Sequence, residues 1–130
     1  MKKIVAGFVF ACVLAGFSGC GGSSNAEDAT KQMLSAMNDI SGALESVKDK
    51  ETAKAAAPKL EAAVARLQEV KKKAEGIKTT KAEDEKLQKE YMPKILEATT
   101  RMQTAGLNAG LKCGAEPTFM KAIEKMKNLK

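Results

Sequence analysis

The sequence of 130 residues predicts an all-α fold: an antiparallel three-helix bundle with a short fourth C-terminal helix, preceded by a cleaved signal helix and a flexible tether. Aromatic residues make up only 4% of the chain, whereas strands are rich in aromatic and β-branched side chains. Alanine, the strongest helix former, occurs 21 times. Beyond residue 25, apolar residues recur at intervals of three and four, which is the period of one helix face.

Residues 1–19 have the layout of a signal peptide. Lys2 and Lys3 precede an apolar run from Ile4 to Phe17, and small residues follow that run. The run is too short to cross a membrane as a helix. We therefore expect residues 1–19 to be removed during export.

The end of this segment, Phe17-Ser18-Gly19-Cys20, resembles the lipobox of bacterial lipoproteins. The resemblance implies that Cys20 receives a diacylglyceryl thioether, is freed by signal peptidase II and is then N-acylated with a fatty acid such as palmitate. In this class an acidic residue after the cysteine often signals retention in the inner membrane, and Gly21 is not acidic. The resemblance therefore implies a protein that is attached through Cys20 to the outer membrane and faces the periplasm.

Residues 20–25 are predicted to form a lipidated tether, and residues 26–130 a helical bundle domain. Glycine and serine dominate the tether, and both make a linker flexible. A first helix is expected over about residues 26–48, with Asn25 as its N-cap. Its apolar residues are spaced by four, three, four and three, which places them in one stripe: Met33, Met37, Ile40, Leu44 and Val47.

A second helix is expected from its N-cap, Asp49, to Gly76, where glycine favours a C-terminal stop. Pro58 cannot donate a hydrogen bond to the carbonyl of Lys54, so we expect a kink or a restart there. Residues 47–60, VKDKETAKAAAPKL, resemble runs found in small predicted helical lipoproteins of bacteria whose activity is unassigned.

A third helix is predicted to begin at a capping box formed by Thr80 and Glu83 and to continue to Ala109. Pro93 interrupts its hydrogen bonding and should bend it. Residues 110–115 are expected to be irregular. Pro117 suits the first turn of a short fourth helix.

The composition argues against most catalytic chemistry. The chain has no histidine, which removes the usual general base and a common metal ligand. The one acidic triplet, Glu83-Asp84-Glu85, fans out by about 100° per residue on a helix, so it suits the helix dipole better than a metal ion. Two arginines and one tyrosine give no support for nucleic-acid binding. We expect no catalytic residue, no metal site and no cofactor.

Two features keep more than one interpretation. Cys113 is the one thiol left after processing and lipidation, and it is a buried small residue, a reactive thiol or an intermolecular disulfide partner. The run Lys71-Lys72-Lys73 is a solvated helix face, or it contacts an anionic lipid or polymer.

The fourth helix carries an apolar face that something must cover, because an isolated helix of this length is marginal in water. Either the bundle covers it, or the face binds a lipid surface or another protein. The candidate interaction face consists of Phe119, Met120, Ile123 and Met126.

The leading hypothesis is a lipid-anchored cell-envelope protein with a non-enzymatic binding or structural role. Its partners would be the membrane, through Cys20, and either an unknown envelope protein or a second copy of the chain. The alternative is a small-ligand carrier or an enzyme with a pocket between helices.

Lys130 resembles the lysine through which murein lipoprotein is joined to peptidoglycan, but the uninterrupted heptads of that family are missing.

Overall fold

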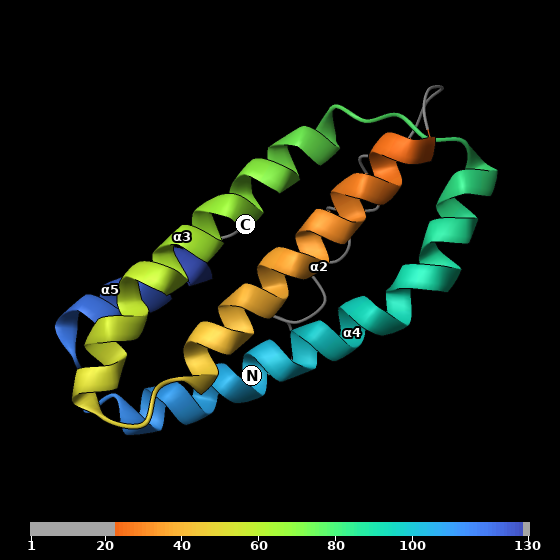
Figure 1. Cartoon of the computed structure of the whole chain (residues 1–130). Coiled ribbons are helices and arrows are strands. Elements are labelled where there is room, and N and C mark those ends of the chain that lie inside the picture. Colours follow the sequence, from red (N-terminus) through yellow and green to blue (C-terminus); the bar gives the residue numbers. More distant parts are fainter. Residues whose placement is uncertain (1–22, 129–130) are drawn as a thin grey trace, which may run out of the picture.

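A computed structural model describes residues 23–128, which form four α-helices and no strand (Figure 1). The prediction of an all-α protein is therefore confirmed for this part of the chain. The predicted signal peptide at 1–19, the predicted lipidation site Cys20 and Lys130 lie outside the described residues. The helices are α2 (Ser23–Glu45), α3 (Lys50–Glu75), α4 (Lys81–Lys112) and α5 (Pro117–Lys127).

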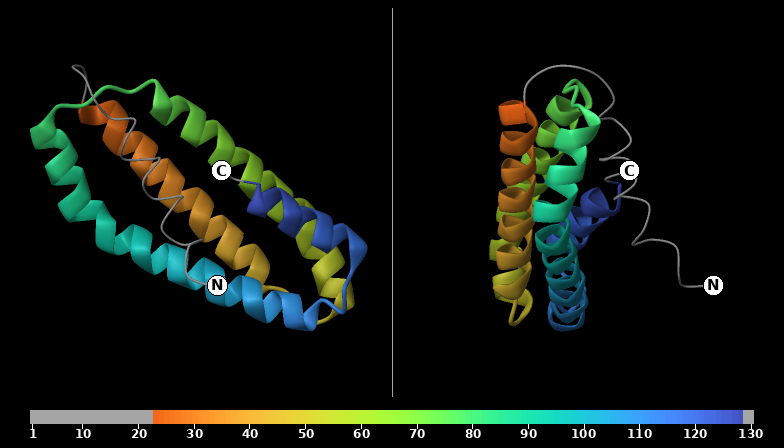
Figure 2. Two further views of the ribbon diagram at one scale, coloured as in Figure 1. Left: turned by 180° about the vertical axis from the view of Figure 1, so that it is seen from behind. Right: turned by 90° about the vertical axis from the view of Figure 1, so that its right-hand side faces the viewer.

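The central helix of the structure is α2, which packs along both α3 and α4. Helices α3 and α4 contact each other little, and α5 packs against α3. Figure 2 shows α2 on one side of the layer that α3 and α4 form, with α5 on the opposite side. The core therefore forms mainly where α2 packs against α3 and α4, two helices that hardly contact each other.

Three segments meet at one end of the molecule: the start of α2, the connection 76–80 and the start of α4 (Figure 1). We call this the α3–α4 end. The connection 46–49, the end of α4 and the start of α5 lie at the opposite end, which we call the α2–α3 end.

The first helix lies earlier in the chain than predicted. It begins at Ser23 rather than Ala26, so Asn25 is a helical residue and not the N-cap. It ends at Glu45 rather than at Lys48, because the backbone amides of Lys48 and Asp49 donate to the side-chain oxygen of Thr52. Three residues of the predicted tether, 23–25, therefore belong to α2.

The predicted start of α3 is confirmed. Asp49 is the N-cap and forms a capping box with Thr52. Pro58 causes no restart, since α3 is continuous from Lys50 to Glu75. Pro58 and Lys54 are both exposed, so water can reach the carbonyl that loses its hydrogen bond. Gly76 does follow the last helical residue, but with φ −87° it is not the left-handed glycine of a Schellman stop.

The predicted capping box of Thr80 and Glu83 starts α4, and Figure 1 shows this helix bending along its length. Pro93 lies inside the helix, as expected of a residue that bends one. The helix runs to Lys112, three residues past its predicted end, so the irregular stretch is shorter than 110–115. Pro117 occupies the first turn of α5, and the side chain of Glu116 caps that helix.

Alanine fills much of the core. Among the described residues, 12 of the 23 buried hydrophobic side chains are alanines. The larger cluster joins α2, α3, the end of α4 and α5, with Phe119, Ile40, Leu44 and Leu60 as its largest fully buried members. A smaller cluster, formed by Met37, Tyr91, Ile95 and Ala98, holds α2 to the first half of α4. Small side chains let helix backbones approach closely, so alanine serves here as core.

Candidate functional site

The α3–α4 end carries a concentration of positive charge. Residues 71–81 contain five lysines and one acidic residue, Glu75. Four of these lysines are exposed and Lys71 is half-buried. Within residues 23–128, Lys72, Lys73 and Lys78 lie in no ion pair. This group, which we call the lysine cluster, comprises Lys71, Lys72, Lys73, Lys78 and Lys81.

Several acids near the lysine cluster are engaged in the fold. The Glu83 carboxylate accepts a hydrogen bond from the Thr80 backbone amide at 2.8 Å, which closes the capping box of α4. Asp84 accepts from the hydroxyl of Thr79, a buried residue of the connection. These carboxylates stabilise the start of α4, because they bind first-turn groups and their negative charge is favourable at the N-terminal end of the helix dipole. The exposed acids of this end are Asp28, Glu75 and Glu85.

Tyr91 fixes α2 against α4 next to this end. Its ring is buried, and its hydroxyl donates to Glu27 Oε1 at 3.1 Å across 64 residues of sequence. Glu27 also pairs with Lys31 at 2.8 Å. Burial raises the pKa of Tyr91, with the hydrogen bond to Glu27 as the next cause, whereas Lys31 and then Tyr91 lower the pKa of Glu27. Tyr91 is thus a neutral anchor for the start of α2.

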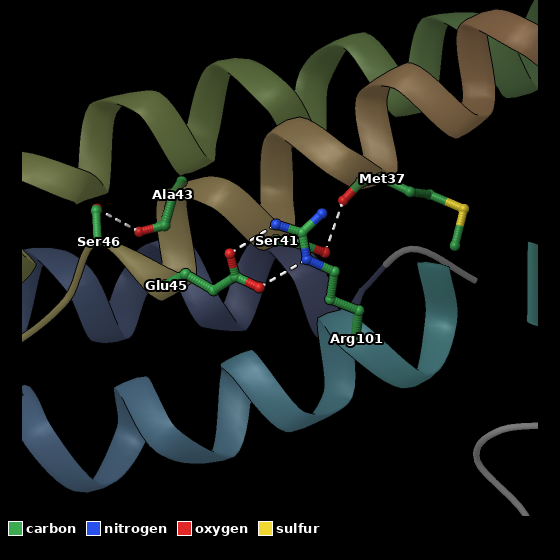
Figure 3. Close-up of polar contacts among 6 residues, drawn as sticks. All are labelled: Met37, Ser41, Ala43, Glu45, Ser46 and Arg101. Atoms are coloured by element: carbon green, nitrogen blue, oxygen red, sulfur yellow. Dashed lines mark hydrogen bonds and ion pairs between the residues drawn. The ribbon is translucent and has the colours of Figure 1, made fainter. Parts of the chain in front are cut away.

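The C-terminal end of α2 is held to α4 by Glu45 and Arg101. Figure 3 shows the guanidinium facing the carboxylate, with Arg101 Nε and Nη2 donating to its two oxygens at 2.7 Å each. Both side chains are about half exposed, so this pair adds geometric specificity more than stability. In the same view the hydroxyl of Ser41, a buried residue, donates a hydrogen bond to the backbone carbonyl of Met37.

A groove of about 570 Å³ lies between α2 and α3. Two of its three charged lining residues pair with each other, because Arg66 Nη1 donates to Asp39 Oδ2 at 2.9 Å. It opens broadly to solvent and lies on the outside of the helix pair, with Asn38, Gly42, Ser46 and Lys59 among its lining residues. No group of three acidic or cysteine side chains among the described residues is arranged to hold a metal ion, and this includes Glu83-Asp84-Glu85.

The candidate interaction face of the fourth helix lies mostly inside the protein. Phe119 is fully buried, and Ile123 and Met126 are partly buried against the larger core cluster. Met120 remains exposed, at 43%. Lys125 joins α5 to Glu61 of α3 at 2.8 Å, and the carboxylate of Glu116 accepts from the Phe119 amide at 2.6 Å.

Cys113, the candidate for an intermolecular disulfide, is also buried. Its side chain is fully enclosed at the end of α4, and its Sγ donates to the carbonyl of Gly110 at 3.3 Å. A second chain cannot reach this sulfur unless the turn after α4 opens.

Helix α4 also carries an exposed apolar surface that was not among the sequence-based predictions. Leu107 and Leu111 are exposed at 73% and 85%, and Leu96 at 55%. The three lie within about 60° of one another on the helix, on the side away from α2. Their spacing of 11 and four residues is readable in the sequence, because both intervals return to nearly the same side of a helix.

No helix in the described part of the chain is long and apolar enough to cross a membrane. The chain matches no protein-family model, and comparison with curated proteins and with solved structures found no significant match. The candidate site therefore rests on the chain's own residues: the lysine cluster, the acids tied into caps beside it, and the start of α2.

Proposed function

We propose that this chain is a lipid-anchored protein of the cell envelope, with a binding or structural role that is not enzymatic. The observation that carries the proposal is the order of features at the N-terminus: two lysines, an apolar run, small residues and Cys20. Three residues after Cys20, a helical domain begins at Ser23. Attached acyl chains would hold this domain stably at a membrane.

The anchored domain is an antiparallel three-helix bundle with a short fourth helix. We place the anchor in the outer membrane, with the domain facing the periplasm, because the resemblance to lipoproteins implies this location when the residue after the cysteine, here Gly21, is not acidic. The absence of histidine supports a role without general acid–base catalysis. The alternative of a carrier or enzyme with a pocket between helices has less support, since alanine side chains fill much of the core and the groove between α2 and α3 opens broadly to solvent.

The proposal is tested by metabolic labelling. Bacteria expressing the full chain are grown with a labelled fatty acid, and we expect the label in the wild-type protein and not in Cys20→Ser. Cys12→Ser is the matched control, because Cys12 lies in the segment to be removed; it should be labelled as the wild type is. Equal labelling of wild type and Cys20→Ser, or none in either, would contradict the proposal.

A further inference from the structure

We propose that the α3–α4 end of the bundle faces the membrane and that the lysine cluster binds the phosphate groups of anionic lipids. This inference rests on the proposed anchor at Cys20 and adds an orientation and a lipid class to it. Three observations support it: the length of chain between anchor and fold, the charge of this end, and the distance to the other end.

The length of chain comes first. Only residues 21 and 22 separate Cys20 from the first residue of α2. Because a residue spans at most about 3.6 Å, the Cα atoms of Cys20 and Ser23 are within about 11 Å of each other. The start of α2 lies at the same end as the 76–80 connection (Figure 1). A lipid on Cys20 therefore keeps this end, and no other, beside the headgroups.

The charge of this end is complementary to an anionic surface. The lysine cluster places five cations within 11 residues, with Glu75 as the one acid among them. Glu83 and Asp84 are occupied by the capping box and by Thr79, and Glu27 by Lys31 and Tyr91. Each lysine close to an anionic bilayer increases the binding constant about fivefold. The lipid anchor and the lysine cluster would thus both bind the membrane at the same end of the protein.

The opposite end is too far away to compete. Helix α3 has 26 residues, which at 1.5 Å per residue gives a length of about 39 Å. Lys48 and Lys50 at the α2–α3 end are therefore several Debye lengths from the anchor, since that length is about 8 Å at physiological ionic strength. Lysines at the two ends of one protein give an internal comparison.

The test uses the full chain, processed by bacteria and reconstituted into two kinds of vesicle: phosphatidylcholine alone, and phosphatidylcholine mixed with phosphatidylglycerol. An amine-reactive reagent is added briefly, and modification of each lysine is measured by peptide mass spectrometry. We expect Lys72, Lys73 and Lys78 to react several-fold more slowly on the anionic vesicles, and high salt to remove the difference. Lys48 and Lys50 should react equally on both.

A pair of variants sharpens the test. Lys72→Gln/Lys73→Gln/Lys78→Gln should abolish the protection of Lys81 on anionic vesicles, whereas Lys48→Gln/Lys50→Gln should leave it unchanged. All five positions are exposed, so circular dichroism should show unchanged helix content.

If the protein floats with both vesicles and its lysines react alike on both, the anchor stands and this inference is overturned. Protection of Lys48 equal to that of Lys72 also overturns it. If the protein does not float with either vesicle, the anchor itself fails and the inference fails with it.

Discussion

At the scale of single residues, the turn between α4 and α5 is the most unusual backbone in the described chain. Gly114 and Ala115 both have φ of +58°, in the left-handed region. Glycine adopts this conformation freely, whereas an alanine there costs about 1–2 kcal/mol. Two successive residues in this conformation turn the chain from the end of α4 into α5, so the turn accepts strain at Ala115.

We predict that Ala115→Gly stabilises the protein by about 0.5–1 kcal/mol, because relief of the strain exceeds the entropy that glycine gains when unfolded. Gly114→Ala should destabilise by a similar amount, and apart from Gly114 and its two chain neighbours no described atom lies within 4 Å of the added methyl group. Urea unfolding of residues 21–130 measures both. Two variants that shift stability in the same direction would contradict the assigned turn.

Glu116, in the same turn, should make stability depend on acid. The Phe119 amide, which donates to its carboxylate, lowers the pKa of Glu116 from its ordinary value of 4.5. A lowered folded pKa gives stability that is present above pH 4.5 and is lost as the pH falls through the folded pKa. We expect Glu116→Gln to flatten the decline of the urea midpoint below pH 4.5. Part of the decline will remain, because Glu27, Glu45 and Asp49 also have lowered pKa values. If the urea midpoint of Glu116→Gln depends on pH as that of the wild type does, Glu116 does not contribute to the loss of stability in acid.

At the scale of elements, α5 is a core element although its sequence also suits a docking helix. Phe119 is fully buried, whereas its neighbour Met120 is 43% exposed. The ring joins the cluster that contains Leu60 and Leu44, so α5 helps to close the α2–α3 end.

We predict that Phe119→Ala lowers the free energy of unfolding by about 3–5 kcal/mol, the usual cost of removing a buried ring. Met120→Ala should change it by no more than about 0.5 kcal/mol. Because such a loss could unfold a marginal bundle, Phe119→Leu supplies an intermediate, with an expected cost of below about 1.5 kcal/mol. Unfolding curves that coincide for Phe119→Ala and the wild type would mean that α5 is not part of the core.

The helix ends show what local sequence can predict. The predicted helix starts at Asp49, at Thr80 with Glu83 and at Pro117 are confirmed because each signal is local. The capping side chains accept hydrogen bonds from amides of the first turn, and Pro117 needs no hydrogen-bond donor there. The start of α2 was placed three residues late, because Ser23 and Ser24 suggest a linker and only the structure shows them in a helix. The outward leucines of α4 were missed although their spacing is a helix period.

At the scale of the whole molecule, contacts between distant segments could not be predicted. Tyr91 with Glu27, and Arg101 with Glu45, join residues 64 and 56 positions apart, and nothing near either residue indicates its partner. Three alanines of α3, Ala53, Ala56 and Ala57, are buried in the larger cluster, and that burial depends on helices from other parts of the chain. The lysine cluster was visible in the sequence, but its place beside the start of α2 depends on how the helices pack.

The attachment of a lipid at Cys20 is the claim on which location and orientation both depend. The most direct measurement is the intact mass of the protein purified from bacterial envelopes, together with mass spectrometry of its N-terminal peptide. We expect a chain that begins at Cys20 and carries the added mass of a diacylglyceryl group and an amide-linked fatty acid. A chain that begins elsewhere, or that begins at Cys20 with an unmodified thiol, would contradict a lipid-anchored protein.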